Sequence, residues 1–196
     1  MSVPAVEHHV GPWTVDDVLA LPEDTHHRIE LLGGALLLTP HPDVPHQRAS
    51  SRLAVLLNTA IEACAAPFEV LTAINLLVPD GLLIPDLVVA DANAAATADP
   101  SLRACDVLVA IEVTTPSTRV ADTVLKSAMY AAVGIPHYWR LELDPAPRLH
   151  LGHPEDGAYV DRIVQAGESS ALTDPFPPRP QPRSAAPVVQ GHRRRA

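Results

Sequence analysis

Two short apolar segments, each interrupted by one carboxylic acid, constrain the fold of this chain more than any other feature. They read LLIPDLVVA, residues 82–90, and VLVAIEVTT, residues 107–115. Apolar residues flank Asp86 and Glu112 at consecutive positions, which is the pattern of a strand covered on both faces. Helices on the faces of a sheet provide that cover. We therefore expect a mixed α/β (α+β) fold, with a central mixed β-sheet flanked by helices.

Other local patterns supply the remaining elements of such a fold. Thr14 and Asp17 form a capping-box pattern, so a short helix is expected near residues 13–21. A hairpin is expected at 27–40 around two glycines, followed by an amphipathic helix at 44–65. The further expected elements are two strands at 68–91 around Asp80-Gly81, a strand at 105–115, a helix from about 117 to Gly134, and short strands at 137–143, 148–152 and 158–165.

Asp86 and Glu112 lie where a carboxylate is costly unless it shifts its pKa or finds a partner. One such acid can pair with an arginine. Two acids in separate central strands indicate a common partner, and a divalent cation is the natural one. Mg²⁺ typically takes one or two carboxylates and keeps water molecules that a substrate phosphate can replace.

Two further polar residues are candidates for the same site. Glu30, in HRIELL, is also flanked by apolar residues. It either joins the metal site or forms a salt bridge with Arg28 or Arg48. His46 precedes most of the long helix and either faces the same cavity as an accessory residue or is a polar residue at the helix entry.

Lys126 is the only lysine in a chain that otherwise uses arginine. If its helix packs back along the strand of Glu112, the two residues lie at similar depth, because strands rise about 3.3 Å and helices about 1.5 Å per residue. We expect Ala121, Leu125, Ala128 and Ala132 to face the core, with Lys126 beside them. The alternatives are an exposed ion pair with Asp122, four residues earlier, and a simple codon preference for arginine.

Three segments together carry a resemblance to a known family. They are HRIELLGGALLLTPHPDVPHQR, IPDLVVAD and AIEVTTPSTRVADTVLKSAMYAAVGIPHYW. Over roughly residues 13–165 the chain closely resembles the Uma-two family of restriction-endonuclease-like domains, within the PD-(D/E)XK nuclease superfamily. The resemblance implies a restriction-endonuclease-like sheet flanked by helices. It is most specific from Glu112 to Trp139.

The resemblance also implies a catalytic site. In this superfamily an Asp and a Glu bind Mg²⁺, and a lysine two positions after the Glu helps to activate water. Thr114 occupies that position here, and Lys126 matches the site on the following helix where the related family carries its lysine. Asp86, Glu112 and Lys126 are thus the implied catalytic residues, and Glu30 matches an early acidic position of the family.

The implied reaction is hydrolysis of DNA phosphodiester bonds assisted by Mg²⁺ or Mn²⁺. Thr114 follows Glu112 by two residues on the same side of the strand, so its backbone carbonyl is a further candidate metal ligand. Nucleases of this class often act as homodimers, which makes a second copy of the chain a candidate partner. The family often has Gly-Glu in the hairpin where this chain has Gly34-Ala35.

Charge and composition indicate what the chain can bind, how it divides into domains and where in the cell the protein is expected. The net charge of −9 argues against broad nonspecific binding of nucleic acid, although it permits a local site. We expect a flexible N-terminus at 1–12, one domain at 13–170 and a disordered Pro/Arg-rich tail at 171–196. No leader pattern opens the sequence and no apolar run reaches about 18 residues, so we expect a cytoplasmic protein with no membrane partner.

Two functions therefore compete. One is a Mg²⁺-dependent endonuclease. The other is a catalytically inactive nuclease-like fold that serves as an interaction or regulatory module, which the acidic charge and the missing Gly-Glu acid favour. A serine hydrolase or a zinc hydrolase has little support, because the sequence holds neither a Gly-x-Ser-x-Gly nor an HExxH motif.

Overall fold

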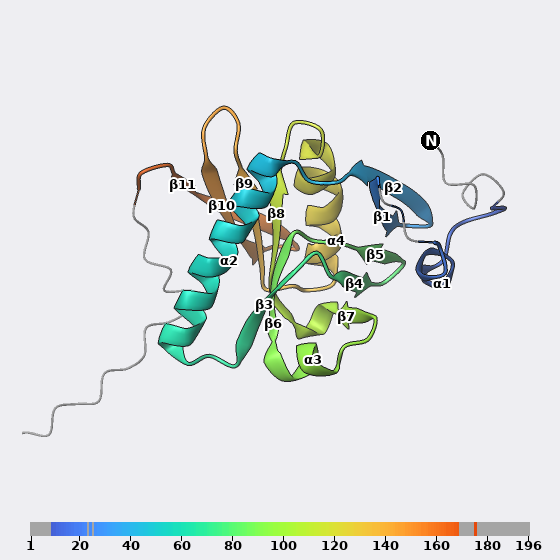
Figure 1. The fold of residues 1–196 in the computed structure, drawn as a ribbon, viewed down its shortest axis with the longest axis horizontal. Coiled ribbons are helices and arrows are strands. Elements are labelled where there is room, and N and C mark those ends of the chain that lie inside the picture. Colours follow the sequence, from blue (N-terminus) through green and yellow to red (C-terminus); the bar gives the residue numbers. More distant parts are fainter. Residues whose placement is uncertain (1–8, 23, 25, 169–174, 176–196) are drawn as a thin grey trace, which may run out of the picture.

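Helices separate runs of consecutive strands along the chain (Figure 1). The structure is a computed structural model, and it describes residues 9–22, 24, 26–168 and 175. In chain order the elements are α1 (Val15–Leu19), β1 (His27–Leu32), β2 (Ala35–Pro40), α2 (Val44–Cys64), β3 (Phe68–Thr72), β4 (Asn75–Val78), β5 (Gly81–Leu83), β6 (Leu87–Asp91), α3 (Ala92–Thr97), β7 (Ser101–Arg103), η1 (Ala104–Asp106), β8 (Val107–Thr114), η2 (Ala121–Lys126), α4 (Ser127–Ala132), β9 (His137–Glu142), β10 (Arg148–Glu155) and β11 (Ala158–Gln165).

The strands form two mixed sheets. The six-stranded sheet has the order β11-β10-β9-β8-β6-β3, with β8 and β9 parallel and its other neighbours antiparallel. The five-stranded sheet has the order β2-β1-β5-β4-β7. The expected α/β fold with a mixed sheet flanked by helices is confirmed. The sequence patterns had suggested one sheet, and the chain divides its strands between two.

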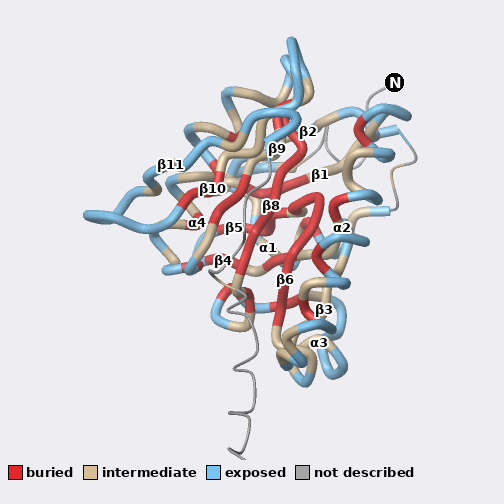
Figure 2. The backbone as a smooth tube through the Cα atoms, turned by 90° about the vertical axis from the view of Figure 1, so that its left-hand side faces the viewer, coloured by how far each residue is buried: buried red, intermediate tan, exposed pale blue. Residues whose placement is uncertain are grey.

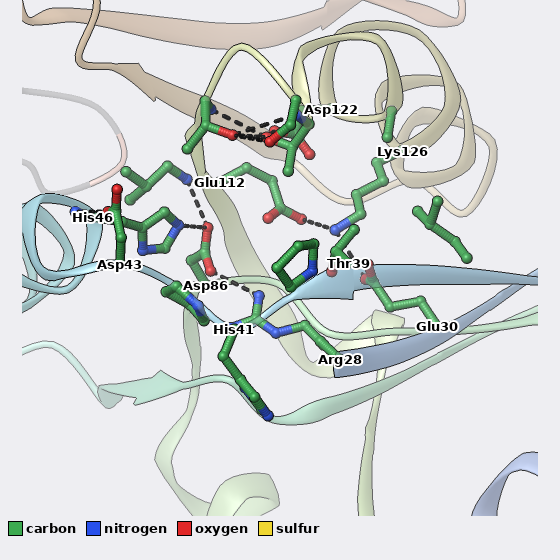
Figure 3. A pocket seen from close by; sticks show the side chains of 18 of the residues that line it. Arg28, Glu30, Thr39, His41, Asp43, His46, Asp86, Glu112, Asp122 and Lys126 are labelled. Carbon is green, nitrogen blue, oxygen red and sulfur yellow. Dashed lines mark hydrogen bonds and ion pairs between the residues drawn. The ribbon is translucent and has the colours of Figure 1, made fainter. Parts of the chain in front are cut away.

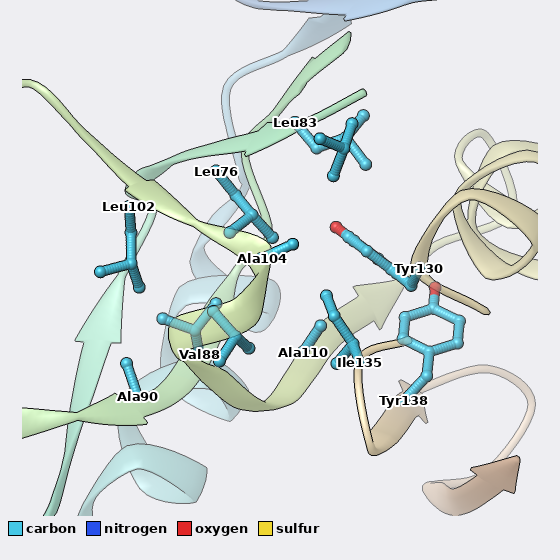
Figure 4. Packing of buried hydrophobic residues seen from close by; sticks show 12 residues of the cluster. Leu76, Leu83, Val88, Ala90, Leu102, Ala104, Ala110, Tyr130, Ile135 and Tyr138 are labelled. Atoms are coloured by element: carbon cyan, nitrogen blue, oxygen red, sulfur yellow. The ribbon is translucent and has the colours of Figure 1, made fainter. Parts of the chain in front are cut away.

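Both faces of β6 and β8 are covered, as their apolar runs predict. Leu87 and Val89 of β6 pack with Leu57 of α2 on one face. Val88 and Ala90 of β6 pack on the other face in a cluster that includes Tyr130 of α4 (Figure 4). The two strands are accordingly among the most deeply buried parts of the backbone (Figure 2). The alternation places Ala110 and Glu112 of β8 on the α4 side of the sheet.

The local predictions are largely confirmed. Thr14 and Asp17 form both hydrogen bonds of the capping box, and the hairpin and the long helix occupy their expected places. The expectation of two strands within 68–91 is wrong, because the segment forms four. Ala73 adopts a left-handed conformation with φ of 49°. It separates β3, in the six-stranded sheet, from β4, in the five-stranded one.

The expected boundaries at the two ends fall largely outside the described residues. Residues 1–8 of the N-terminus are not described, and of the expected tail only Pro175 is. Within the part of the chain that is described, no helix has the length and hydropathy needed to cross a membrane.

Candidate functional site

A cavity of about 410 Å³ lies between the β1–β2 hairpin, the start of α2 and the end of β8 (Figure 3). Several of the charged residues that line it come from elements far apart in the sequence. They are the acids Glu30, Asp86, Glu112 and Asp122 and the cations Arg28 and Lys126. All four acids are buried, so the site concentrates negative charge away from water.

Asp86 precedes β6 and lies opposite Glu112 if the β6–β8 register is continued by one residue. Its Oδ1 accepts a 2.8 Å hydrogen bond from Arg28, and its Oδ2 accepts one of 2.8 Å from the backbone N–H of Val113. His46 Nε2 lies 3.0 Å from Oδ2. Burial opposes ionisation, but the hydrogen bond from His46 and the charge of Arg28 outweigh it and lower the pKa of Asp86 to about 2. Asp86 is therefore an anion at neutral pH, and His46 Nε2 must donate to it.

Lys126 bridges two buried acids. Its Nζ lies 2.9 Å from Glu30 Oε1 and 3.0 Å from Glu112 Oε1. Burial would lower the pKa of Lys126, but Glu112 and Glu30 together raise it, so the ammonium keeps its proton. Full burial raises the pKa of Glu112 well above its usual range, and the charge of Lys126 offsets this only in part. The Tyr130 hydroxyl also donates to Glu112 Oε1, at 3.0 Å.

The helix that carries Lys126 turns a polar face inward. Asp122, Lys126 and Tyr130 are all buried, with Lys126 only 4% exposed, whereas Leu125 is 47% exposed. The predicted core-facing positions of Leu125, Ala128 and Ala132 are therefore wrong, because all three are exposed, and so is the alternative of an exposed Asp122–Lys126 pair. The three inward residues are spaced by four, which is close to one turn, and η2 is a π-helical turn of the kind often found at functional sites. The ion pairs of Lys126 across the cavity and the packing of Tyr130 in the core together accompany the burial of this face.

The family model that matches the chain is Uma2, described as "Putative restriction endonuclease", and it matches residues 15–183. The chain belongs to the Uma2 family. The resemblance read from the sequence segments is thereby confirmed. A comparison with curated proteins gives no match.

Among solved structures, this Uma2 chain is similar to the crystal structure of "a putative nuclease belonging to DUF820" from Anabaena variabilis ATCC 29413. The TM-score is 0.62 at 17% sequence identity, over 81% of this chain and 87% of the other. At that identity the likeness concerns the fold alone. It agrees with the restriction-endonuclease-like architecture expected for a Uma2 protein.

The structure brings most of the residues singled out in this Uma2 sequence to one cavity. Glu30, His46, Asp86, Glu112 and Lys126 all line it. Glu30 pairs with Lys126 and accepts a 2.7 Å hydrogen bond from the backbone N–H of Ile84, so the alternative pairing with Arg28 or Arg48 is wrong.

Thr114 has a different place. It is the last residue of β8, buried, and opposite Glu142 of β9 in the parallel register. It is not among the residues that line the cavity, whereas its neighbours Val113 and Thr115 are. A metal-ligating role of the Thr114 carbonyl remains a prediction.

The donor set permits a divalent ion at Asp86 and Glu112. The contacts described above leave Oε2 of Glu112 unused, and they use Oδ1 of Asp86 only once. Carboxylate oxygens on adjacent strands are ligands that Mg²⁺ accepts, and water or phosphate completes its shell. Among the described residues, no three or more His, Cys, Asp and Glu side chains are grouped to hold a metal. An ion here would therefore rely on these two carboxylates and on water or phosphate for its remaining ligands.

Sequence reasoning missed three residues of this site. The sequence patterns indicate Arg28 only as a partner of Glu30 and Asp122 only as an exposed partner of Lys126, and they do not single out Tyr130. The spacing of four from Asp122 to Lys126 and Tyr130 was the available signal. Arg28 also stands two residues before Glu30, on the same face of β1.

Proposed function

We propose that this Uma2 protein is a Mg²⁺- or Mn²⁺-dependent endonuclease that hydrolyses phosphodiester bonds in DNA. The observation that carries the proposal is the contact of Lys126 with Glu112, 3.0 Å apart in the wall of the cavity that Asp86 also lines. A buried acid pair beside a fixed ammonium is suited to a reaction in which negative charge grows on a phosphate. Family membership supports the reaction class, since restriction-endonuclease-like families generally use divalent metals.

Asp86 and Glu112 would hold the ion. When bound, the ion would neutralise charge on the phosphate and would lower the pKa of a nearby water. Asp86 is ionised throughout the physiological range because its pKa is about 2. Glu112 must be ionised to act as a ligand, and a cation beside it favours that form.

Lys126 acts as a hydrogen-bond donor and a positive charge, not as a base. Its raised pKa keeps it protonated. An ammonium has three N–H donors, and the contacts with Glu30 and Glu112 use two of them. The third can orient the attacking water or stabilise the charge that develops on the phosphate oxygens. Glu30 holds the amine in place, and we assign it a supporting rather than a ligating role.

The test is DNA cleavage with Mg²⁺ or Mn²⁺ on supercoiled plasmid, linear duplex and single strands. The variants are Asp86→Asn, Glu112→Gln and Lys126→Met, with Glu62→Gln on the exposed face of α2 as the matched control. We expect wild type and the control to cut, and the three site variants to lose activity. Melting temperatures with and without metal, measured on the same samples, separate loss of the ion from loss of the fold.

The competing function is a nuclease-like interaction or regulatory module that does not cut. The observation that favours it is the pairing of every cavity acid with a group of the protein itself, such as Asp86 with Arg28. If the wild type cuts none of the substrates and no divalent metal changes its melting temperature, this second function replaces the first.

A further inference from the structure

Arg28 occupies an unexpected position in the cavity. It extends from β1, and its Nη1 donates hydrogen bonds of 2.8 Å to Asp86 Oδ1 and 3.2 Å to the backbone carbonyl of Ile84. Its side chain is largely buried, and it lies on the same face of β1 as Glu30. β1 thus contributes to the site both the acid that anchors Lys126 and a second permanent cation.

The two oxygens of Asp86 are not equivalent toward an incoming ion. Oδ2 already accepts hydrogen bonds from the N–H of Val113 and from His46. Each carboxylate oxygen has about two acceptor positions, so Oδ2 is filled. An ion shared with Glu112 must therefore reach Asp86 through Oδ1, which is the oxygen held by Arg28. Arg28 uses one of the two acceptor positions of Oδ1, so the ion would share this oxygen with the guanidinium, and like charges that close repel each other.

We propose that Arg28 is a catalytic residue that leaves Asp86 when the ion binds and then contacts the scissile phosphate. The inference rests on the proposed function of the same site. A guanidinium displaced from Oδ1 stays tethered to β1 inside the cavity, with the Ile84 carbonyl as its remaining partner. Its planar fork matches two phosphate oxygens at once, a geometry that an ammonium cannot reproduce.

The opposing interpretation is that Arg28 only anchors Asp86. The two roles differ in their effect on metal affinity. An anchor keeps Asp86 oriented, so its loss weakens Mg²⁺ binding. A competitor for Oδ1 opposes the ion, so its loss leaves Mg²⁺ binding equal or tighter while the phosphate contact disappears.

The experiment compares Arg28→Met, Arg28→Lys and the wild type. Arg103→Met is the control, since Arg103 forms an exposed pair with Asp106 away from the cavity. Calorimetry measures Mg²⁺ affinity, then the affinity of the Mg²⁺-loaded protein for inorganic phosphate, and cleavage assays give kcat. For Arg28→Met we expect Mg²⁺ affinity no weaker than wild type. We also expect phosphate affinity lower by about tenfold or more and kcat lower by roughly 10²–10³-fold.

Arg28→Lys keeps the positive charge and covers the case in which Arg28→Met does not fold. It should bind Mg²⁺ as the wild type does and still lose about tenfold in kcat, because the two-point contact is gone. The inference is overturned if Arg28→Met binds Mg²⁺ more weakly than the wild type and its phosphate affinity falls only by the same factor as its Mg²⁺ affinity. That result leaves the proposed function intact. Full activity of Arg28→Lys also overturns the inference and leaves the proposed function intact. Absence of Mg²⁺ binding in the wild type overturns both.

Discussion

Nζ of Lys126, in the helical segment after β8, lies 2.9 Å from Oε1 of Glu30, in strand β1 of the five-stranded sheet. The contact joins the two sheets across the cavity, because the same ammonium also reaches Glu112 in the six-stranded sheet. One side chain therefore links the acids of both sheets. Removing its charge should affect stability and the site together.

Replacing Lys126 with Met should destabilise the metal-free protein strongly. The side chain keeps its shape, but Glu30 and Glu112 lose their shared cation while both stay buried. Breaking a buried pair by removing one partner costs about 3–5 kcal/mol. Chemical denaturation measures the free energy of unfolding. Arg103→Met is the control and should cost less than about 1 kcal/mol, because its ion pair is exposed.

Lys126→Arg should destabilise the protein, even though the positive charge is conserved. The lysine is only 4% exposed, and the larger planar guanidinium has to fit between two fixed carboxylates. Overpacking of this kind costs about 1–3 kcal/mol. A melting temperature equal to wild type would show that the cavity accepts the extra volume and that Lys126 is less tightly held than its contacts indicate.

Tyr130→Phe and Tyr138→Phe form a matched pair of tests. Each removes one buried hydroxyl: Tyr130 donates to Glu112 Oε1 at 3.0 Å, and Tyr138 donates to the backbone carbonyl of Asp122 at 2.8 Å. Both variants should lose about 1 kcal/mol of stability. Only Tyr130→Phe should also weaken Mg²⁺ binding, by about tenfold, because it alone removes a group that orients Glu112. Equal metal affinity in the two variants would contradict this distinction.

The pKa of Asp86 predicts a specific pH dependence of stability. Its value is about 2 in the folded protein, below the ordinary 3.8. The folded state thus binds fewer protons at this group, and the ionised form stabilises the fold above pH 3.8. That stabilisation, about 2 kcal/mol, is lost as the pH falls from about 4 to about 2.

Urea unfolding of wild type and Asp86→Asn across pH 2–6 measures the effect. The wild type should be the more stable protein near pH 6, and its advantage should shrink below pH 4. A difference that stays constant over the whole range would mean that Asp86 titrates alike in the folded and unfolded states.

Gly81→Ala should disturb the packing that brings β1 to the helix of Lys126. A Cβ at this position would lie 2.7 Å from the carbonyl oxygen of Leu31 and 2.9 Å from Cε of Met129. Relief requires β5, β1 or α4 to move, at a cost of about 1–3 kcal/mol. Ala63→Leu, on an exposed part of α2, is the control and should change stability by less than about 0.5 kcal/mol. Thermal melting distinguishes the two variants.

Much of the architecture follows from local patterns. The capping box at Thr14, the hairpin at Gly33-Gly34 and the apolar strands of Asp86 and Glu112 were all predictable, because each depends on residues within about one turn or one strand. The division of the strands into two sheets was not predictable. It depends on the left-handed conformation of Ala73 and on which sheet offers each strand a partner.

For the site, the sequence by itself determined that Asp86, Glu112 and Glu30 are acids in apolar segments, and that Lys126 is the one lysine of the chain, on the helix after the strand of Glu112. Only the tertiary structure decided how they pair. In the structure Asp86 pairs with Arg28 and His46, and Lys126 lies between Glu30 and Glu112. The tertiary structure also rotates the helix so that Leu125 is exposed and Lys126 is buried. The physical reason is that local periodicity reports the burial of apolar surface, whereas the pairing of buried charges depends on strand register and on contacts between residues far apart in the chain.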